Sequence, residues 1–325
     1  MRCTALSDPA ALWLLCRSGY ARWESNVVSR TVIAAFGAGL IVATSAPVAQ
    51  SAPASARATA GAAFAAGQPG PTNTGVPAGV QLTVHVGDVT ITKAGTVLSG
   101  LDIHGTVSIK AANVTIKNSI IRGGALPTHN HCILLATDSR VTNFLIQDSE
   151  LYPTNVNGYQ NDFCGSHFTA NRINSHFGVD TLDINGSNVT VENSWLHGTT
   201  TYAIDPNKGG HPSHSDNLQI TAGSNIKIVN NTMSGGNNSS IQISQDAGTV
   251  SNVQISGNWL DRGTCSVHVN DKPKSGLSGV TMSNNVFGRF QTITGCAMLV
   301  TTRIGYTVSG NRWTDGTSAR VIVYG

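Results

Sequence analysis

Short runs in which apolar and polar residues alternate recur along most of the chain, and most of them share one pattern. The pattern spans eight residues. Positions 1, 3 and 8 are apolar, position 5 is Asn, Gly or Asp, and position 6 is Asn or Ser. Clear copies begin at Val114, Val189, Ile226, Val253, Val280 and Tyr306. The last four begin 27, 27 and 26 residues apart. Alternation with a period of two is typical of strands that bury one face, so the pattern predicts many short β-strands at a nearly constant spacing.

A second short alternating run precedes most copies of the repeat. These runs are Leu182–Ile184, Leu218–Ile220, Ile241–Ile243, Val267–Val269 and Met298–Val300. A fixed period with several very short strands per unit indicates a β-solenoid. A β-propeller is the alternative, but its blades need about 40–45 residues and four longer strands. An immunoglobulin-like sandwich has no internal repeat.

A solenoid would bring equivalent residues of successive coils together. Four residues share one repeat position, so we expect their amides to form a hydrogen-bonded ladder along the axis: Asn231, Asn258, Asn285 and Asn311. Cys265 and Cys296 each stand two residues before equivalent strand residues, and strands lie about 4.7–4.9 Å apart, within the reach of a disulfide. We therefore predict the disulfides Cys265–Cys296 and Cys132–Cys164.

The N-terminal residues differ from the rest in composition. Arg30 is followed by 26 residues without a charge, an apolar stretch first and then small residues, which is the order of a secretory signal. A membrane span would need about 20 apolar residues. We expect residues 1–56 to be an upstream segment with a signal peptide, 57–72 an Ala/Gly/Pro-rich linker, and 73–325 the solenoid domain. The protein should then be secreted and monomeric, with no membrane contact after cleavage.

Charge is sparse and nearly balanced. Only 11% of the residues are charged, against about 25% in typical domains. From Arg57 onward, 16 Lys and Arg stand against 15 Asp and Glu, so there is no electrostatic signature of nucleic-acid binding. Only 6% of the residues are aromatic, which gives little support to a broad stacking platform for neutral sugars.

Two groups of polar residues are candidates for a binding groove. In the second row of strands, the residues between the inward apolar pairs should face outward: Asp183, Gln219, Gln242 and His268. The longest interruption between clear repeats, before Ile226, concentrates ionisable side chains: Tyr202, Asp205, Lys208, His211, His214 and Asp216. Long loops in compact domains are often functional. The alternatives are an ordinary solvated strand surface and a solvated loop.

His214 and Asp216 are the sharpest candidate pair. A His and an Asp two residues apart point the same way in an extended strand, and the carboxylate can then orient the imidazole and raise its basicity. The same residues could bind a cation, or the His could be structural. One His and one Asp are too few to define a metal site.

Together these features resemble the right-handed parallel β-helix proteins of the pectate-lyase type, in particular secreted bacterial ones. The resemblance covers about residues 70–325 and rests on repeats such as Val-Thr-Ile-Lys-Asn-Ser (114–119) and on the segments 202–207 and 214–219. It implies an all-β fold, a single right-handed parallel β-helix, which hosts lyases, hydrolases, epimerases and phage adhesins. Residues 202–207 also resemble the Tyr-Gly-x-Asp-Pro-His motif of β-helix mannuronan C5-epimerases, whose Tyr, Asp and His serve the site. Tyr202, Asp205 and Pro206 match that motif, and Asn207 replaces its His.

The leading expectation is a lyase that cleaves a uronic-acid-containing polysaccharide by β-elimination. Lys208 or Lys272 would neutralise the uronate carboxylate, His214, oriented by Asp216, would remove the C5 proton, and Tyr202 would protonate the leaving oxygen. Lys272 and Arg303 would attract an acidic glycan. The expected substrate-binding set is completed by Asp183, Asp205, His211, Gln219, Gln242 and His268.

Three alternatives to the lyase stay open. A glycoside hydrolase would need two carboxylates, for which Asp183, Asp205, Asp216 and Asp246 are candidates. A C5-epimerase would share the first step of elimination, and a non-catalytic carbohydrate-binding or cell-surface solenoid would form no product. No metal ligand set or cofactor site is evident, although Ca²⁺ could assist.

Overall fold

The computed structural model describes residues 64–124, 132–205, 208–272, 274–302 and 304–325. Within these ranges the chain forms 28 strands and no α-helix. None of these residues forms a helix that is long and apolar enough to cross a bilayer. The expected signal peptide, the first part of the expected linker and Arg303 lie outside the described residues.

The strands form three faces, and each face is built of parallel strands from successive coils. Face A contains β1 (Thr83–Val86), β4 (Leu101–His104), β7 (Ile120–Ile121), β10 (Glu150–Leu151), β13 (Asn174–His176), β16 (Trp195–His197), β18 (Thr232–Ser234), β21 (Trp259–Leu260), β24 (Val286–Phe287) and β27 (Arg312–Trp313). Face B contains β2 (Val89–Ile91), β5 (Val107–Ile109), β8 (Cys132–Ala136), β11 (Asn161–Gly165), β14 (Leu182–Asn185), the first part of β17 (Asp216–Val229), β19 (Ser239–Ile243), β22 (Val267–Val269), β25 (Met298–Thr301) and β28 (Val321–Tyr324). Face C contains β3 (Val97–Ser99), β6 (Thr115–Lys117), β9 (Phe144–Gln147), β12 (Phe168–Asn171), β15 (Val189–Glu192), the second part of β17, β20 (Val250–Ser256), β23 (Ser278–Ser283) and β26 (Tyr306–Ser309).

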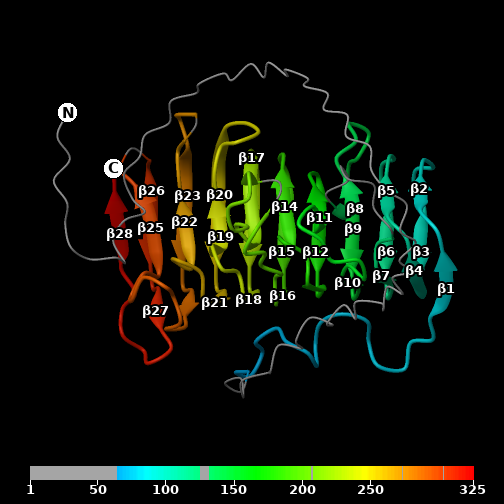
Figure 1. Ribbon diagram of the computed structural model, residues 1–325, viewed down its shortest axis with the longest axis horizontal. Coiled ribbons are helices and arrows are strands. Elements are labelled where there is room, and N and C mark those ends of the chain that lie inside the picture. Colours follow the sequence, from blue (N-terminus) through cyan, green and yellow to red (C-terminus); the bar gives the residue numbers. More distant parts are fainter. Residues whose placement is uncertain (1–63, 125–131, 206–207, 273, 303) are drawn as a thin grey trace, which may run out of the picture. The chain divides into compact units, whose positions relative to one another are not determined.

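This arrangement is the right-handed parallel β-helix that the resemblance implies. Each turn of the chain contributes one strand to each face, and β17 runs through both face B and face C. Figure 1 shows the strands of successive coils side by side in chain order, from β2 to β28. Because partners are in register, a residue on one coil has a defined neighbour on the next.

The interior is a narrow apolar column. On face B the inward residues of successive coils align, as Leu182, Leu218, Ile241 and Val267 do, and all four are buried. Aromatic rings also belong to the column, where Phe163 packs against Phe144 and Phe168. Strands this short are not stable alone, so each one depends on the burial of its apolar side chains in this column.

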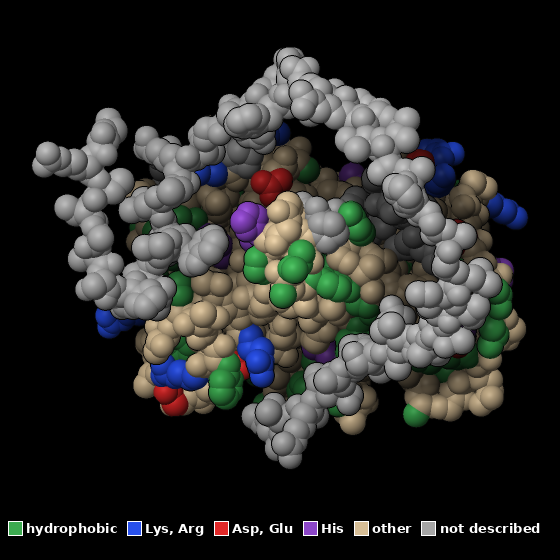
Figure 2. All heavy atoms as spheres, in the orientation of Figure 1, with side chains coloured by type: hydrophobic (Ala, Val, Ile, Leu, Met, Phe, Trp, Pro, Cys, Tyr) green, Lys and Arg blue, Asp and Glu red, His purple; other side chains and the backbone are tan. Residues whose placement is uncertain are grey.

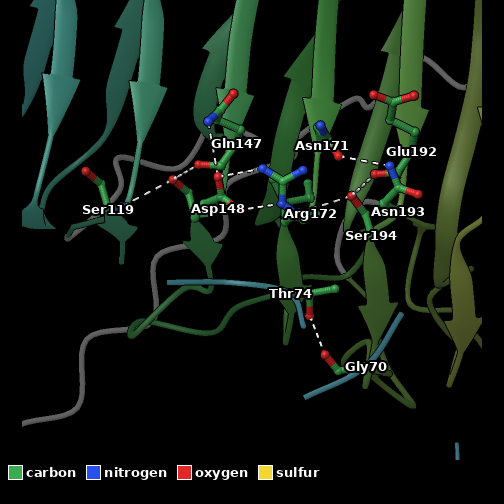
Figure 3. A network of polar contacts seen from close by, with 12 residues as sticks. Gly70, Thr74, Ser119, Gln147, Asp148, Asn171, Arg172, Glu192, Asn193 and Ser194 are labelled. Atoms are coloured by element: carbon green, nitrogen blue, oxygen red, sulfur yellow. Dashed lines mark hydrogen bonds and ion pairs between the residues drawn. The ribbon is translucent and has the colours of Figure 1, made fainter. Parts of the chain in front are cut away.

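The expected asparagine ladder is confirmed. Asn231, Asn258, Asn285 and Asn311 stack inside the helix, and each of the first three donates its side-chain amide to the oxygen of the next at 2.9–3.1 Å. Serines occupy the same column upstream, where the backbone N–H of Ser119 donates to Ser149 Oγ at 3.2 Å. Figure 3 shows this part of the molecule together with an outer ion pair, in which Arg172 Nε donates to Asp148 Oδ1 at 2.6 Å.

The residue before the ladder position explains the Asn, Gly or Asp of the repeat. This residue has a left-handed backbone on most coils, for example at Asn118 (φ 49°), Asn193 (φ 53°) and Gly257 (φ 66°). Asn, Asp and Gly tolerate that conformation better than other residues. The repeat therefore encodes the sharp bend from face C to face A.

Both predicted disulfides are present. Cys132 pairs with Cys164 and Cys265 pairs with Cys296, with Cα–Cα distances of 5.8 and 4.8 Å. Each disulfide links neighbouring coils on the side of face B. The last residues of the expected linker pack on face A, where the ring of Phe64 meets that of Trp195 edge-on at 5.6 Å.

Candidate active site

A cleft of about 610 Å³ opens along face B and the turns that lead into it. Nine of the residues predicted from the sequence line it: Asp205, Lys208, His214, Asp216, Gln219, Gln242, Asp246, His268 and Lys272. The remaining lining residues are Gly158, Tyr159, Asn161, Val179, Asp180, Asn238, Ser244 and Asn270. The cleft therefore spans several coils, as a site for a linear polymer would.

The predicted outward column is confirmed by the strand register. Asp183 is opposite Gln219, Gln219 is opposite Gln242, and Gln242 is opposite His268. Asp183 belongs to this column but does not line the cleft. Burial raises its pKa to about 6, and the charge of Asp246 adds to the shift, while Thr221 Oγ1, 3.5 Å from Asp183 Oδ1, opposes it.

A second pair of carboxyls lies where two neighbouring strands of face B begin. Leu182 is opposite Leu218, which places Asp180 and Asp216 at equivalent positions two residues earlier. The backbone N–H of Asp216 donates to Asp180 Oδ1 at 2.8 Å. Both residues are buried and both line the cleft. Sequence reasoning selected Asp216 and missed Asp180, although both occur in the pattern Asp-x-Leu-x-Ile.

Burial raises the pKa of both carboxyls. The pKa of Asp180 lies well above its usual range because of burial and because of the charge of Asp216. The pKa of Asp216 is raised to about 7, again chiefly by burial, and hydrogen bonds from Asn238 and Ser239 oppose the shift. Lys208 lowers the pKa of both carboxyls. Ionising both of these neighbouring carboxyls would place two negative charges side by side, which is unfavourable, so the pair retains one proton near neutral pH.

Amides on the flanking coils orient the two carboxyls. Asn238 Nδ2 donates to both oxygens of Asp216, at 3.0 and 3.1 Å. On the other side, Asn161 Nδ2 lies 3.4 Å from Asp180 Oδ2, and Asn161 Oδ1 accepts the backbone N–H of Asp180 at 3.1 Å. These hydrogen bonds fix the orientation of both carboxyl groups, and acid–base chemistry needs such preorganisation.

The long segment between β16 and β17 forms one wall of the cleft. Its neck is closed by Tyr202 and Ser213, since Ser213 N–H donates to the Tyr202 carbonyl at 2.9 Å and Tyr202 N–H donates to Ser213 Oγ at 2.8 Å. At its tip, Asp205 N–H donates to the carbonyl of His211 at 2.9 Å. Lys208 and His214 are presented to the cleft.

Two residues predicted for the site on this segment do not line the cleft. These are Tyr202 and His211. The pKa of Tyr202 is raised by partial burial and by the charge of Asp205, which keeps the phenol protonated.

The predicted pairing of His214 with Asp216 is not what the structure contains. His214 is exposed, whereas Asp216 is buried with both carboxylate oxygens on Asn238. Burial and the charge of Lys208 lower the pKa of His214, and Asp205 is the carboxylate that opposes this shift. The alternation rule failed because His214 precedes the first residue of β17 and is not part of the strand.

His268, which lines the cleft, pairs with a tyrosine that the sequence did not suggest. His268 Nε2 lies 2.8 Å from the phenol oxygen of Tyr324 in β28. Burial lowers the pKa of His268, and burial together with Asp271 raises the pKa of Tyr324. His268 is therefore a neutral hydrogen-bonding group near pH 7.

The cleft has more acidic than basic side chains. Among the described residues its lining includes four carboxyls, Asp180, Asp205, Asp216 and Asp246, and two lysines, Lys208 and Lys272. No group of three or more His, Cys, Asp or Glu in the described ranges is arranged to hold a metal ion.

Comparisons with known proteins find likeness at the level of structure. No family model and no curated protein matches the chain. The A-module of the Azotobacter vinelandii mannuronan C-5 epimerase AlgE4 is 11% identical with a TM-score of 0.46, over 72% of this chain and 65% of that one. The catalytic unit of a GH87 alpha-1,3-glucanase from Streptomyces thermodiastaticus is 14% identical with a TM-score of 0.48, over 70% and 50%. The Dettilon tailspike protein is 12% identical with a TM-score of 0.36, over 73% and 52%. The chain thus spans about half to two thirds of these structures, and at such identities the likeness does not extend to function.

Proposed function

We propose that the chain is a polysaccharide-active enzyme that hydrolyses glycosidic bonds with the carboxyl pair Asp180 and Asp216. The observation that carries this proposal is the pair itself: two buried carboxyls on neighbouring coils, in an open cleft, whose pKa values are both raised. Elevated pKa values in a cleft are typical of acid–base sites.

Glycoside hydrolysis needs one carboxylic acid and one carboxylate. The acid protonates the leaving oxygen, and the carboxylate activates water or attacks the anomeric carbon. Asp180, whose pKa is raised by burial and by the charge of Asp216, is assigned as the acid in this proposal. Asp216 is assigned as the carboxylate, because its oxygens accept hydrogen bonds from Asn238 that favour the ionised form.

The charge of the cleft favours hydrolysis over β-elimination. Four carboxyls and two lysines line it, so an acidic glycan is less well matched than a neutral one. Lys208, which a lyase would direct at the substrate carboxylate, acts on the pKa values of Asp180 and Asp216. A neutral glycan is therefore the proposed substrate class, in place of the uronate polymer that the sequence favoured.

β-Elimination on a uronate polymer is the second candidate. Lys208 and His214 both line the cleft, which supports their expected roles as neutralising group and base. Lowering of the His214 pKa leaves its imidazole neutral, as a base requires.

One assay distinguishes these candidates. The protein is incubated with neutral glycans, including α-1,3-glucan, and with uronate polymers, including mannuronan and pectate, with Ca²⁺ and with a chelator. We expect new reducing ends on a neutral glycan without the ultraviolet absorbance of unsaturated uronides. Asp216→Asn and Asp180→Asn should each lower kcat by about 10²–10⁴-fold. Asp138→Asn is the control, because Asp138 pairs with Arg140 on an exposed turn outside the cleft.

The other outcomes each have a defined meaning. Ultraviolet absorbance on a uronate polymer, lost in His214→Ala and retained in Asp216→Asn, would replace hydrolysis with elimination. Retention of full activity by both Asp variants would refute the assignment of the carboxyl pair. Binding without any product would leave a carbohydrate-binding solenoid.

A further inference from the structure

Exposed apolar side chains gather at one corner of the β-helix. Five large hydrophobic residues, which we call the rim, lie in the turns that lead from face A to face B: Val156 (41% exposed), Phe177 (47%), Ile204 (75%), Phe290 (73%) and Ile293 (43%). The remaining exposed large hydrophobics of the described residues lie in the first coils, in the last coils or at Phe64. Figure 2 shows that apolar side chains reach the surface in separate groups, one of them beside a histidine.

Three rim residues stand close in sequence to residues that line the cleft. Phe177 is two residues before Val179, and Ile204 directly precedes Asp205, and both Val179 and Asp205 line the cleft. Val156 stands in the same turn as the lining residues Gly158 and Tyr159. Phe290 and Ile293 continue the corner on a later coil. Val156, Phe177 and Ile204 are thus each within two residues of the cleft lining.

Phe177 occupies a position at which the next two coils have glycine. The register of face A places it in line with Gly198, and then with Gly235 on the next coil. All three residues have a left-handed backbone, with φ of 76° at Phe177, 58° at Gly198 and 99° at Gly235. For a bulky residue this conformation is a true outlier and is unfavourable, and such residues cluster at ligand-binding sites.

The strained ring is held in place by its surroundings. Phe177 N–H donates to the carbonyl of Gly198, and Thr200 Oγ1 donates to the carbonyl of Phe177. The ring packs edge-on against His176 and Tyr152, with centroid distances of 4.2 and 6.5 Å. Because the ring is already ordered, little side-chain entropy is lost when something binds to it.

Phe290 is held in a comparable way. Asp261 Oδ1 accepts the backbone N–H groups of both Arg262 and Phe290, at 2.8 and 3.1 Å. The guanidinium of Arg262 lies over the Phe290 ring at 5.9 Å. Arg262 is also left-handed, with φ of 73°. The turns thus present a second aromatic ring to solvent in a fixed place.

We propose that the rim binds the surface of an insoluble polysaccharide and delivers one of its chains to the cleft. Packed polysaccharide chains present the apolar C–H faces of their sugar rings, and ordered aromatic and aliphatic side chains bind such faces. The rim residues lie at the same corner on three successive coils and on one later coil, so a chain bound along them would lie along the coil axis. This inference names the substrate class of the proposed function and rests on it.

Adsorption to particles tests the proposal without turnover. Wild-type protein and Asp216→Asn are mixed in the cold with particles of cellulose, chitin and insoluble α-1,3-glucan, and the protein left in the supernatant is measured. We expect adsorption to at least one particle, equal for both proteins. In the double variant Phe177→Gly/Phe290→Ala, the partition constant should fall about tenfold. Thermal unfolding is the folding control, and Phe177→Gly by itself should not lower the melting temperature, because glycine relieves the left-handed strain.

A matched variant separates the rim from general stickiness. Val84→Thr/Val86→Thr removes apolar groups of comparable exposure from β1, outside the rim, and should adsorb as wild type does. The proposal is wrong if wild type stays in the supernatant with every particle, if the β1 variant loses adsorption equally, or if the rim variants adsorb normally. It is also wrong if the same substitutions abolish self-association in sedimentation, because the rim would then be an interface between copies. Adsorption without any product would support binding by the rim and refute hydrolysis in the cleft. Hydrolysis of soluble glycans without adsorption would support hydrolysis and refute binding by the rim.

Discussion

The buried asparagine ladder gives the most direct test of how the coils are held together. Asn258 is fully buried in its centre. Its Oδ1 accepts the backbone N–H and the side-chain amide of Asn231, at 2.9 and 3.1 Å. Its Nδ2 donates to the carbonyl of Ile228 at 2.9 Å and to Asn285 Oδ1 at 3.0 Å. The substitution Asn258→Ala removes all four hydrogen bonds and leaves their partners buried.

The magnitude follows from these contacts. A buried hydrogen bond contributes about 0.5–1.5 kcal/mol net, so four bonds give about 4 kcal/mol, with a range of about 2–6 kcal/mol. Asn252→Gly is the control. Asn252 belongs to an exposed outer column, donates only to Asn225 Oδ1 at 2.7 Å, and has φ of 51°, which glycine adopts readily. Its loss should change the free energy of unfolding by less than about 0.5 kcal/mol.

Urea unfolding followed by far-ultraviolet circular dichroism measures both variants. We expect the midpoint for Asn258→Ala to fall while the slope of the transition is unchanged. A loss below about 1 kcal/mol with an unchanged slope would refute the reasoning, since that is the value of a single bond. A loss for Asn252→Gly equal to that for Asn258→Ala would show that burial of the ladder is irrelevant.

Two further predictions concern pH and the disulfides. The pKa values of Asp216 (about 7) and Asp183 (about 6) are raised in the folded protein, so the stability that these groups contribute is complete at acid pH and is lost as the pH rises from about 4 through 6–7. Asp216→Asn should therefore raise the melting temperature at pH 8 and leave it unchanged at pH 4, and a lower melting temperature at pH 8 would contradict the raised pKa. Replacing Cys265 and Cys296 by Ser reopens a 31-residue loop and should lower the free energy of unfolding by about 3–4 kcal/mol. Reduction of the wild type should match part of this loss in urea titrations, and an unchanged midpoint in the double variant would show that the stacked strands already supply the constraint.

The sequence was a good guide wherever the repeat determines the neighbours of a residue. The stacking of Asn231 on Asn258, the pairing of Cys265 with Cys296, and the alignment of Asp183 with Gln219 all follow from equivalent positions on successive coils. The hydrophobic period makes such positions visible, because a one-residue slip would turn the apolar side chains outward.

Outside the strands the sequence was a weaker guide. Tyr202 and His211 are close to the catalytic candidates along the chain, but neither lines the cleft, because closeness along an irregular segment does not fix which residues face the site. Asp180 was missed because it is 36 residues from Asp216, and only the register of β14 on β17 brings the two carboxyls together. The raised pKa values of Asp180 and Asp216 depend on their burial, which cannot be read from the sequence pattern.

The segment between β16 and β17 has a consequence for how such a site can evolve. Asn188 and Asn225 are separated by 37 residues and Asn225 and Asn252 by 27, yet both pairs of side chains are hydrogen bonded, at 3.2 and 2.7 Å. Most of the additional residues lie at one corner, between β16 and β17. One irregularity follows inside β17, where Asn185 pairs with Ala222 after Ile184 pairs with Ile220, and the register resumes with Val189 opposite Ile226. The stacked strands and this segment are therefore structurally separable. The strands set the spacing of Asp180 and Asp216, while the segment between β16 and β17, which forms one wall of the cleft, can be lengthened, shortened or exchanged. Selection or engineering can thus alter what enters the cleft without rebuilding the groups that act on it.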